Sequence, residues 1–358
     1  MKKLIAIFGV LAFTAGMAFA QNNNATIEQS GSDENDAKIE QIGAYNTGTI
    51  NQIGEQGKKT GDIYQEGTGN TATVNQAADR GGRDANDIAN ISQVGHDNTA
   101  TVDQGPHTYS NANTNFADVD QQGNENEATV TQTARRLQDA FILQVGNNNT
   151  AITDQDNVMS SGRAIVDIEQ RGFDNYAWVD QKVDRAATAD IYQFGDDNTA
   201  EIDQSLIKYT TGTNEAHIDQ VGNNNNARID QAIDVVPHGQ TGYVFAEINQ
   251  DGDYHYALID QDGKNQIFIA DIDQDGSGQE AWIYQKGEGS EGETTEAWII
   301  QEGANNWATI NQDGVGQWSK IDQNGIGNWA ETTQNGTGNW AQTNQNGDNN
   351  IATIIQNQ

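Results

Sequence analysis

The residues of this sequence that could carry chemistry are mainly carboxylates. Asp271, Asp273 and Asp275 have the spacing that opens an EF-hand calcium loop. Such a loop ends in a bidentate Glu at its twelfth position, which is Trp282 here, and the residues between the three carboxylates follow the alternation of a strand. We therefore expect no EF-hand calcium site in this segment.

The other candidates for catalysis or metal binding are equally weak. The chain has no cysteine, which excludes disulfides and thiolate metal sites, and its serines show no nucleophile-elbow context. Aspartates recur at regular intervals, and this repetition explains them better than a carboxylate pair for glycoside hydrolysis does. The sequence thus predicts no enzyme activity, no cofactor and no metal ion. The five histidines, which have no metal-ligand spacing, are His96, His107, His217, His238 and His255.

The elements that position these residues must be unusual, because the composition is unlike that of a globular domain. The 358 residues carry a formal net charge of -34, and only 35% of them are apolar. With a mean hydropathy of -0.75, such a chain is typical of disorder unless something other than an apolar core orders it. A specific nucleic-acid partner is not expected, because the chain lacks an overall positive footprint.

The N-terminus has the features of a secretion signal peptide. Lys2 and Lys3 precede an apolar stretch over residues 4–13, and Ala18 and Ala20 form an A-x-A cleavage site. We predict that residues 1–20 are removed and that the chain is exported through the periplasm to the outside of the cell. No later apolar run is long enough to insert into a membrane.

A repeat of the form A-x-[IVT]-x-Q-x-G-x-x-N-x-A-x-[IVT]-x-Q covers the rest of the chain. One clear copy runs from Ala89 to Gln104. The 27 anchoring glutamines, Gln29 to Gln356, form thirteen pairs with a constant interval of 11 residues and a leading half at Gln29. Between pairs the interval varies from 11 to 19 residues. This alternation indicates two arms per coil, joined by a fixed turn at one edge and by a variable loop at the other.

Each repeat predicts a strand, a tight turn and a second strand. Ala, Ile or Val, and Gln alternate with period two, so they share one face of a strand. The x-Gly-x-x-Asn segment supplies residues that tolerate positive φ, and both prolines, Pro106 and Pro237, fall in the variable loops. We predict an all-β, two-arm β-solenoid of about thirteen coils, as a single domain over residues 21–358.

Stacked side-chain amides are expected to supply much of the stability. A column of identical Gln or Asn residues lets each amide donate to the next coil and accept from the previous one. The expected ladder residues are Gln93, Gln104, Gln193, Gln204, Gln220, Gln231, Gln301, Gln312, Gln323, Gln334, Gln345, Gln356, Asn98, Asn198, Asn225 and Asn306, and the turn glycines are Gly95, Gly195, Gly222 and Gly303.

The repeat resembles the curlin repeat, Q-x-G-x-x-N-x-A-x-x-x-Q, of the major curli subunits. The resemblance implies a subunit that self-assembles head to tail into extracellular amyloid fibres for biofilm matrix, surface adhesion and cell aggregation. It also implies a nucleating minor curlin and an outer-membrane secretion pore as partners. One departure is that the family's serine six residues before the first Gln is mostly replaced, with Asp87, Asn115, Gln138 and Asn214 in that position.

Two outward columns add further hypotheses. Neighbouring carboxylates repel, so an acidic column is expected to raise carboxylate pKa values or recruit cations, and assembly is expected to be faster in mild acid. A column of indoles either stabilises the strands by stacking or forms a flat strip that binds a matrix polysaccharide. The acidic column is Asp154, Asp180, Asp203, Asp230 and Asp260, and the aromatic strip is Trp307, Trp318, Trp329 and Trp340.

Two other functions remain open from the sequence. Thr49, Thr73, Thr101 and Thr129 form an outward threonine column of the kind that a flat ice-binding face would need, although Ile152 and the following positions do not continue it. A β-solenoid adhesin that stays monomeric outside the cell would instead require capped ends.

Overall fold

The structure is a computed structural model that describes residues 22–31, 35–54, 57–78, 86–107, 114–133, 137–156, 163–182, 187–207, 214–234, 243–264, 267–288 and 293–358. The predicted signal peptide, Pro237 and His238 lie outside these residues. Pro106 lies near the end of the strand Thr99–His107 and not in a loop, which corrects that expectation. The chain divides into two compact units, unit 1 up to Ala151 and unit 2 from Ile152 onward. That residues 21–358 form a single domain stays a prediction.

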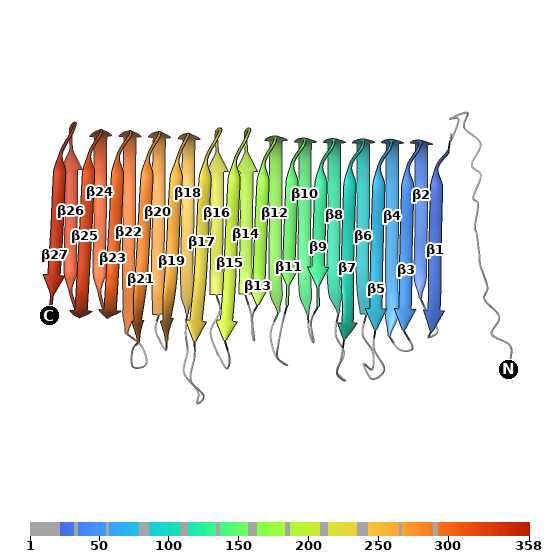
Figure 1. Ribbon diagram of the computed structural model, residues 1–358, viewed down its shortest axis with the longest axis horizontal. Coiled ribbons are helices and arrows are strands. Elements are labelled where there is room, and N and C mark those ends of the chain that lie inside the picture. Colours follow the sequence, from blue (N-terminus) through green and yellow to red (C-terminus); the bar gives the residue numbers. More distant parts are fainter. Residues whose placement is uncertain are drawn as a thin grey trace. The chain divides into compact units, whose positions relative to one another are not determined.

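Unit 1 consists of two parallel sheets. The even-numbered strands form one sheet in the order β2, β4, β6, β8, β10, and the odd-numbered strands form the other in the order β1, β3, β5, β7, β9. Consecutive strands therefore alternate between two layers (Figure 1). The strands are β1 Asn24–Gly31, β2 Asp36–Ala44, β3 Thr47–Gly54, β4 Lys58–Thr68, β5 Thr71–Ala78, β6 Asn86–His96, β7 Thr99–His107, β8 Asn115–Asn124, β9 Glu127–Gln132 and β10 Gln138–Asn147, and β11 Thr150–Gln155 contains the division between the units.

Unit 2 repeats the same architecture. Strands β12 to β26 form its even-numbered sheet and strands β13 to β27 its odd-numbered sheet, all in parallel register. Its strands are β12 Ala164–Phe173, β13 Tyr176–Lys182, β14 Ala187–Phe194, β15 Thr199–Ile207, β16 Asn214–Val221, β17 Asn226–Asp234, β18 Val244–Asp253, β19 Tyr256–Lys264, β20 Ile267–Ser277, β21 Glu280–Glu288, β22 Thr294–Ala304, β23 Trp307–Val315, β24 Trp318–Ile326, β25 Trp329–Thr337, β26 Trp340–Asn346 and β27 Ile351–Asn357.

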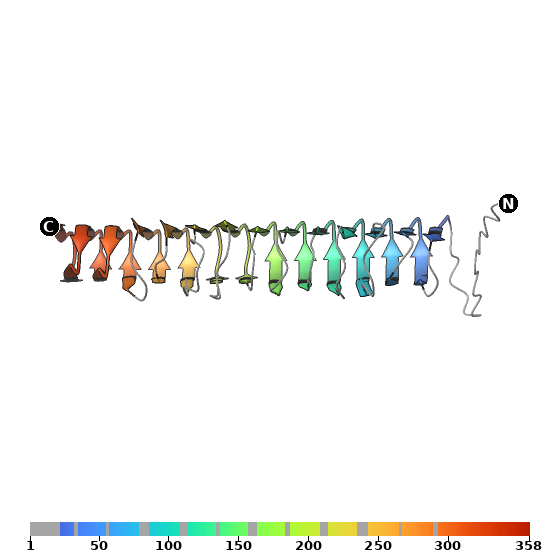
Figure 2. The same cartoon turned by 90° about the horizontal axis from the view of Figure 1, so that it is seen from below.

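The repeat sets the register of the strands. Ala89, Ile91 and Gln93 of β6 lie opposite Ala117, Val119 and Gln121 of β8, so that each interior position stacks on its own kind. Inward side chains are fully buried and alternate with outward, partly exposed ones, because successive residues of a strand point to opposite faces. The view in Figure 2 shows the connections that pass between the two layers of a coil.

These observations confirm the predicted fold class. Each unit is an all-β, two-arm β-solenoid with a thin interior between its two sheets, and the described residues contain no helix. The interior columns consist of Ala, Ile or Val, Gln, and the turn Asn, as the repeat predicts.

A further interior column lies near the loop edge, six residues before the first-arm Gln. In unit 1 the buried members of this column are polar, whereas in unit 2 four of its eight buried members are apolar. Ala164, Ala187, Val244 and Phe268 of unit 2 form one hydrophobic cluster. The buried members are Lys59, Asp87, Asn115 and Gln138 in unit 1, and Ala164, Ala187, Asn214, Val244, Phe268, Thr295, Gln317 and Asn339 in unit 2.

Candidate functional site

The glutamine columns are continuous hydrogen-bonded ladders within each unit. Gln93 Nε2 donates to Gln121 Oε1 over 2.8 Å, and Gln204 Nε2 donates to Gln231 Oε1 over 2.9 Å. The same bond, at 2.8–3.0 Å, links Gln104 to Gln132, Gln193 to Gln220, Gln220 to Gln250, Gln231 to Gln261, Gln301 to Gln323, Gln312 to Gln334, Gln323 to Gln345 and Gln334 to Gln356.

Most ladder glutamines also join the two sheets, which the sequence pattern does not reveal. The second amide hydrogen of Gln93, in the even-numbered sheet, bonds the main-chain oxygen of Thr71 in the odd-numbered sheet over 3.0 Å. Gln104, in the odd-numbered sheet, donates to the main-chain oxygen of Ile88 in the even-numbered sheet, also over 3.0 Å. An unpaired buried amide costs about 1–3 kcal/mol, so each interior Gln depends on both neighbours being in place.

The ladders have a direction. From Gln29 onward the donor lies in the earlier coil and the acceptor in the later one. On the last strand, Gln356 accepts from Gln334 and donates to the main-chain oxygen of Trp340. Within the described residues, one Gln356 amide hydrogen and the Gln29 side-chain oxygen therefore remain unused.

The turn asparagines differ from the expected amide-to-amide ladder. Asn98 does donate to Asn70 Oδ1 over 3.0 Å, but it also bonds the oxygen of Gly123 over 2.8 Å. In unit 2, three of these side-chain amides donate to main-chain oxygen atoms: Asn198 to Gly222, Asn225 to Gly252, and Asn306 to Glu302 and Gly325. Asn350, near the C-terminus, does donate to Asn328 Oδ1 over 2.9 Å. At Asn198, Asn225 and Asn306 the side-chain amide therefore donates to main-chain carbonyl oxygen atoms instead of to the neighbouring Asn.

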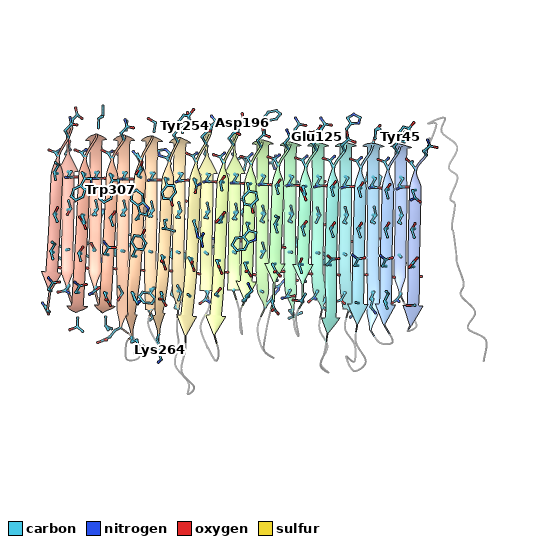
Figure 3. All side chains as sticks on the ribbon, viewed as in Figure 1. Tyr45, Glu125, Asp196, Tyr254, Lys264 and Trp307 are labelled. Carbon is cyan, nitrogen blue, oxygen red and sulfur yellow. The ribbon has the colours of Figure 1, made fainter. Side chains whose placement is uncertain are left out.

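The turn glycines are required by close backbone packing. Gly95 has a φ of 133°, and a Cβ placed there would lie 1.8 Å from the oxygen of Gly123 in the next coil. Gly195, Gly222 and Gly303 face the same obstruction from the oxygen atoms of the glycines that follow them. Figure 3 places Tyr45, Glu125 and Tyr254, which have positive φ, at the turn edges of their units, and Lys264 at the opposite edge.

Interior side chains at the first and last coils lack full cover. Ala37, Ile39 and Gln41 of β2 and Ile354 and Gln356 of β27 point inward but remain partly exposed. The equivalent residues in the middle of each unit are fully buried. Each end therefore presents an incomplete coil with an open sheet edge, which is a surface suited to pairing with further strands.

The acidic column differs from a uniformly solvated surface. Four members of the column, Asp180, Asp203, Asp230 and Asp260, lie in register on neighbouring strands. The charge of Asp180 also contributes to the raised pKa of Asp154 on β11. Asp180 is only 6% exposed and is paired with Lys182, which corrects the expectation that it faces solvent like the others.

Burial, more than repulsion, shifts the titration of this column. The pKa values of Asp154, Asp230 and Asp260 are raised first by burial and second by the adjacent carboxylate. Lys182 beside Asp180, and Arg228 at 3.5 Å from Asp230, offset part of the negative charge. The pKa values of these three carboxylates are therefore raised, as expected, but the main cause is burial of the side chain.

The indoles stack face to face. Trp307 and Trp329 lie 4.9 Å apart with an interplanar angle of 4°, and Trp318 and Trp340 lie 5.0 Å apart at 5°. Each stacked ring covers a face of its neighbour, which favours strand stabilisation over a flat polysaccharide-binding strip, although Trp340 is 59% exposed. Trp282 extends the first stack towards Tyr256 and Trp298 extends the second, both by tilted contacts.

Two histidines of unit 2 have opposite environments that the sequence did not reveal. His217 points outward, and its Nδ1 lies 2.8 Å from Asp190, which raises the pKa of the imidazole. His255 replaces the turn Asn of its coil and is 1% exposed, and burial lowers its pKa. Its Nδ1 faces the backbone N–H of Gln279 at 3.4 Å, which requires the unprotonated nitrogen.

The described residues hold no group of three or more His, Asp or Glu arranged to bind a metal ion. Asp271, Asp273 and Asp275 lie along one strand, β20, so the EF-hand spacing does not produce a loop. In the same part of the chain there is no helix that could span a lipid bilayer.

Residues 111–135 match the family model described as curlin associated repeat. This segment contains β8 and β9 with their turn, one complete coil of unit 1. The match supports assignment of the chain to the curlin repeat family. No curated protein matches the chain.

Proposed function

We propose that this curlin-repeat chain is a secreted structural subunit that self-assembles, head to tail, into extracellular curli-like amyloid fibres. Such fibres would serve biofilm matrix formation, surface adhesion and cell aggregation. The observation that carries the proposal is the pair of incomplete coils at the first and last strands, whose interior side chains and sheet edges match those that pair inside each unit.

The direction of the ladders favours head-to-tail contact. The unused oxygen atoms of Gln29 and Gln41 are acceptors, whereas Gln345 and Gln356 each retain a free donor hydrogen among the described residues. When the first coil of one copy meets the last coil of another, the free donors pair with the free acceptors. When two first coils or two last coils meet, acceptors face acceptors or donors face donors. A head-to-tail polymer therefore avoids the cost of unpaired amides at the contact.

The resemblance to curlins supports further parts of the proposal. The family implies two partners, an outer-membrane secretion pore and a minor curlin that nucleates the fibre. It also implies that residues 1–20 direct export. A matrix polysaccharide is a weaker candidate, because each stacked indole covers a face of its neighbour.

The proposal is tested on adjacent residues of β27 that point to opposite faces. Ile354 points inward and is half-buried, while Ile355 points outward and is 65% exposed. We expect Ile354→Asp to block elongation of preformed seeds, because it places a charge in the interior of the next junction, whereas Ile355→Asp elongates nearly normally. Seeded thioflavin kinetics with electron microscopy measures both. Equal elongation by the two variants, or a wild-type chain that forms no fibres, contradicts the proposal.

Ice binding is the second candidate, and one observation favours it. Thr49, Thr73, Thr101 and Thr129 lie in register as a single outward column of unit 1. In unit 2 the equivalent positions include Trp178, which ends the regular array. Thermal hysteresis in the absence of fibres would favour ice binding, and a stable monomer without it would favour an adhesin.

A further inference from the structure

The interior of unit 1 holds a lysine and an aspartate on adjacent strands. Lys59 of β4 and Asp87 of β6 are register partners in the even-numbered sheet, and each is 1% exposed. Among the lysines that the structure describes, Lys59 alone is buried. Its chain neighbour Lys58 is exposed, so burial distinguishes two adjacent lysines on opposite faces of one strand.

The surroundings hold the aspartate carboxyl in place. The backbone N–H of Asn115, on the next strand β8, donates to Asp87 Oδ1 over 3.4 Å, and Gln76 Nε2 donates to the main-chain oxygen of Asp87 over 3.2 Å. The side-chain amide of Asn115 is fully buried, and neither of its polar atoms has a hydrogen-bond partner. The carboxyl thus lies in a closed space with a donor directed at one oxygen.

Burial changes the protonation chemistry of the lysine. It lowers the pKa of the Lys59 amine, and the charge of Asp87 opposes that shift without reversing it. Away from water, transfer of the lysine proton to the carboxylate converts an ion pair into a neutral amine and a carboxylic acid. A neutral amine is a nucleophile, and a protonated carboxyl is an acceptor for it.

We propose that Lys59 and Asp87 form an intramolecular isopeptide bond once unit 1 has folded. The Lys59 Nζ lone pair attacks Asp87 Cγ, and a Cγ–Nζ bond forms. The N–H of Asn115 stabilises the negative charge that develops on Oδ1. The other Cγ–O bond then breaks, its oxygen takes a proton from Nζ, and one water leaves without any change of oxidation state.

Folding supplies what the reaction needs. Register pairing holds the two groups together, and such fixed proximity replaces a bimolecular encounter. Exclusion of water from the interior removes the competing solvent. The product would covalently join two consecutive coils of unit 1 at their loop edge, where the buried charges would otherwise reduce stability.

Intact-mass spectrometry of the folded wild-type chain, measured after denaturation, tests the proposal. We expect a mass lower by one water than the mature sequence, and a branched peptide in the digest that joins the segments around Lys59 and Asp87. A chain kept in denaturant from synthesis onward should retain the full mass. A succinimide also loses one water, but it yields no branched peptide.

Variants complete the test. Lys59→Met and Asp87→Ala should restore the full mass, whereas Lys58→Met should keep the loss, because Lys58 faces solvent. The wild-type result alone decides the matter even where a variant fails to fold. A folded wild-type chain of full mass, or a loss of water without the branched peptide, overturns the proposal and leaves an unlinked lysine beside a buried aspartate.

Discussion

Units 1 and 2 share their alanine, aliphatic and glutamine columns but differ in the column near the loop edge. Unit 1 buries Lys59, Asp87 and Asn115 there, while unit 2 buries a cluster that includes Val244 and Phe268. Apolar burial contributes about 25 cal/mol per Å², whereas buried polar groups stabilise only when they are paired. The shared columns thus specify the coil, and the variable column sets how stable each unit is.

The outward faces extend the difference. Among the described residues, Asp118 is the one carboxylate of unit 1 whose pKa is raised. The described part of unit 2 has seven such carboxylates, which are Asp154, Asp167, Asp219, Asp230, Asp260, Asp271 and Asp273. More carboxylates with a raised pKa therefore lie on unit 2 than on unit 1, so the stability of unit 2 should depend more strongly on pH.

The largest expected effect comes from emptying the apolar cluster. Phe268 is fully buried, so Phe268→Ala should reduce the stability of the surrounding coils by about 3–5 kcal/mol through lost burial and a cavity. Hydrogen exchange of β18, β20 and β22 measures the local loss, because neighbouring coils of a solenoid can open separately. Phe245→Ala, outward-facing on β18, is the matched control with a smaller effect. Equal effects would mean that the cluster does not set the stability of unit 2.

Overfilling the same cluster is the next test. A Cβ on Gly263 would lie 2.3 Å from Phe268 Cε2, so Gly263→Ala should cost about 1–3 kcal/mol. Adding Phe268→Leu should recover part of that loss, because the smaller side chain leaves room for the methyl group. Chemical denaturation of the two single variants and the double variant gives the coupling. If the effects of the two substitutions on the free energy of unfolding simply add, the added methyl group does not clash with Phe268.

Exchanging residues between the units tests the variable column directly. Asn115→Val should stabilise unit 1, because it removes an amide with no partner, and Val244→Asn should destabilise unit 2, each by about 1–3 kcal/mol. Hydrogen exchange in β8 and β18 reports the two changes. If Asn115→Val destabilises unit 1, the amide has a partner, such as a water molecule, and the comparison between the units weakens.

The repeat predicts most of the fold because the interval of 11 residues fixes both arms of every coil. It predicts the Gln stacking for the same reason. The same register places Lys59 opposite Asp87, because each lies six residues before its first-arm Gln, but the pattern does not show that this position beside the variable loop is buried. The sequence also does not predict which acceptor the turn Asn amide uses, since that depends on how close the next glycine carbonyl lies, as at Asn198.

The histidines should make unit 2 respond to pH in two opposite ways. The folded pKa of His255 is lowered, so its contribution to stability is lost as pH falls through the unfolded value of about 6.5. The folded pKa of His217 is raised, so its contribution is present below about 6.5 and is lost as pH rises through the folded pKa. We expect His255→Asn to improve stability at pH 5 and His217→Gln to reduce it, with little change at pH 8. Thermal melts over that range would show whether either effect is absent.

The smallest expected effect concerns Asp271. Burial raises its pKa to about 6, with Glu247 on the adjacent strand and Asp273 adding to the shift. A raised folded pKa means that the folded unit binds a proton that the unfolded chain does not, so stability rises as pH falls from about 7 towards 4. Asp271→Asn should therefore stabilise unit 2 at pH 7 and have no effect below pH 4. Asp118→Asn is the matched change in unit 1, and its effect should have the same sign. Chemical denaturation at pH 7 and below pH 4 measures the stability of each variant. A gain in stability that is the same at both pH values would show that the amide acts through packing instead.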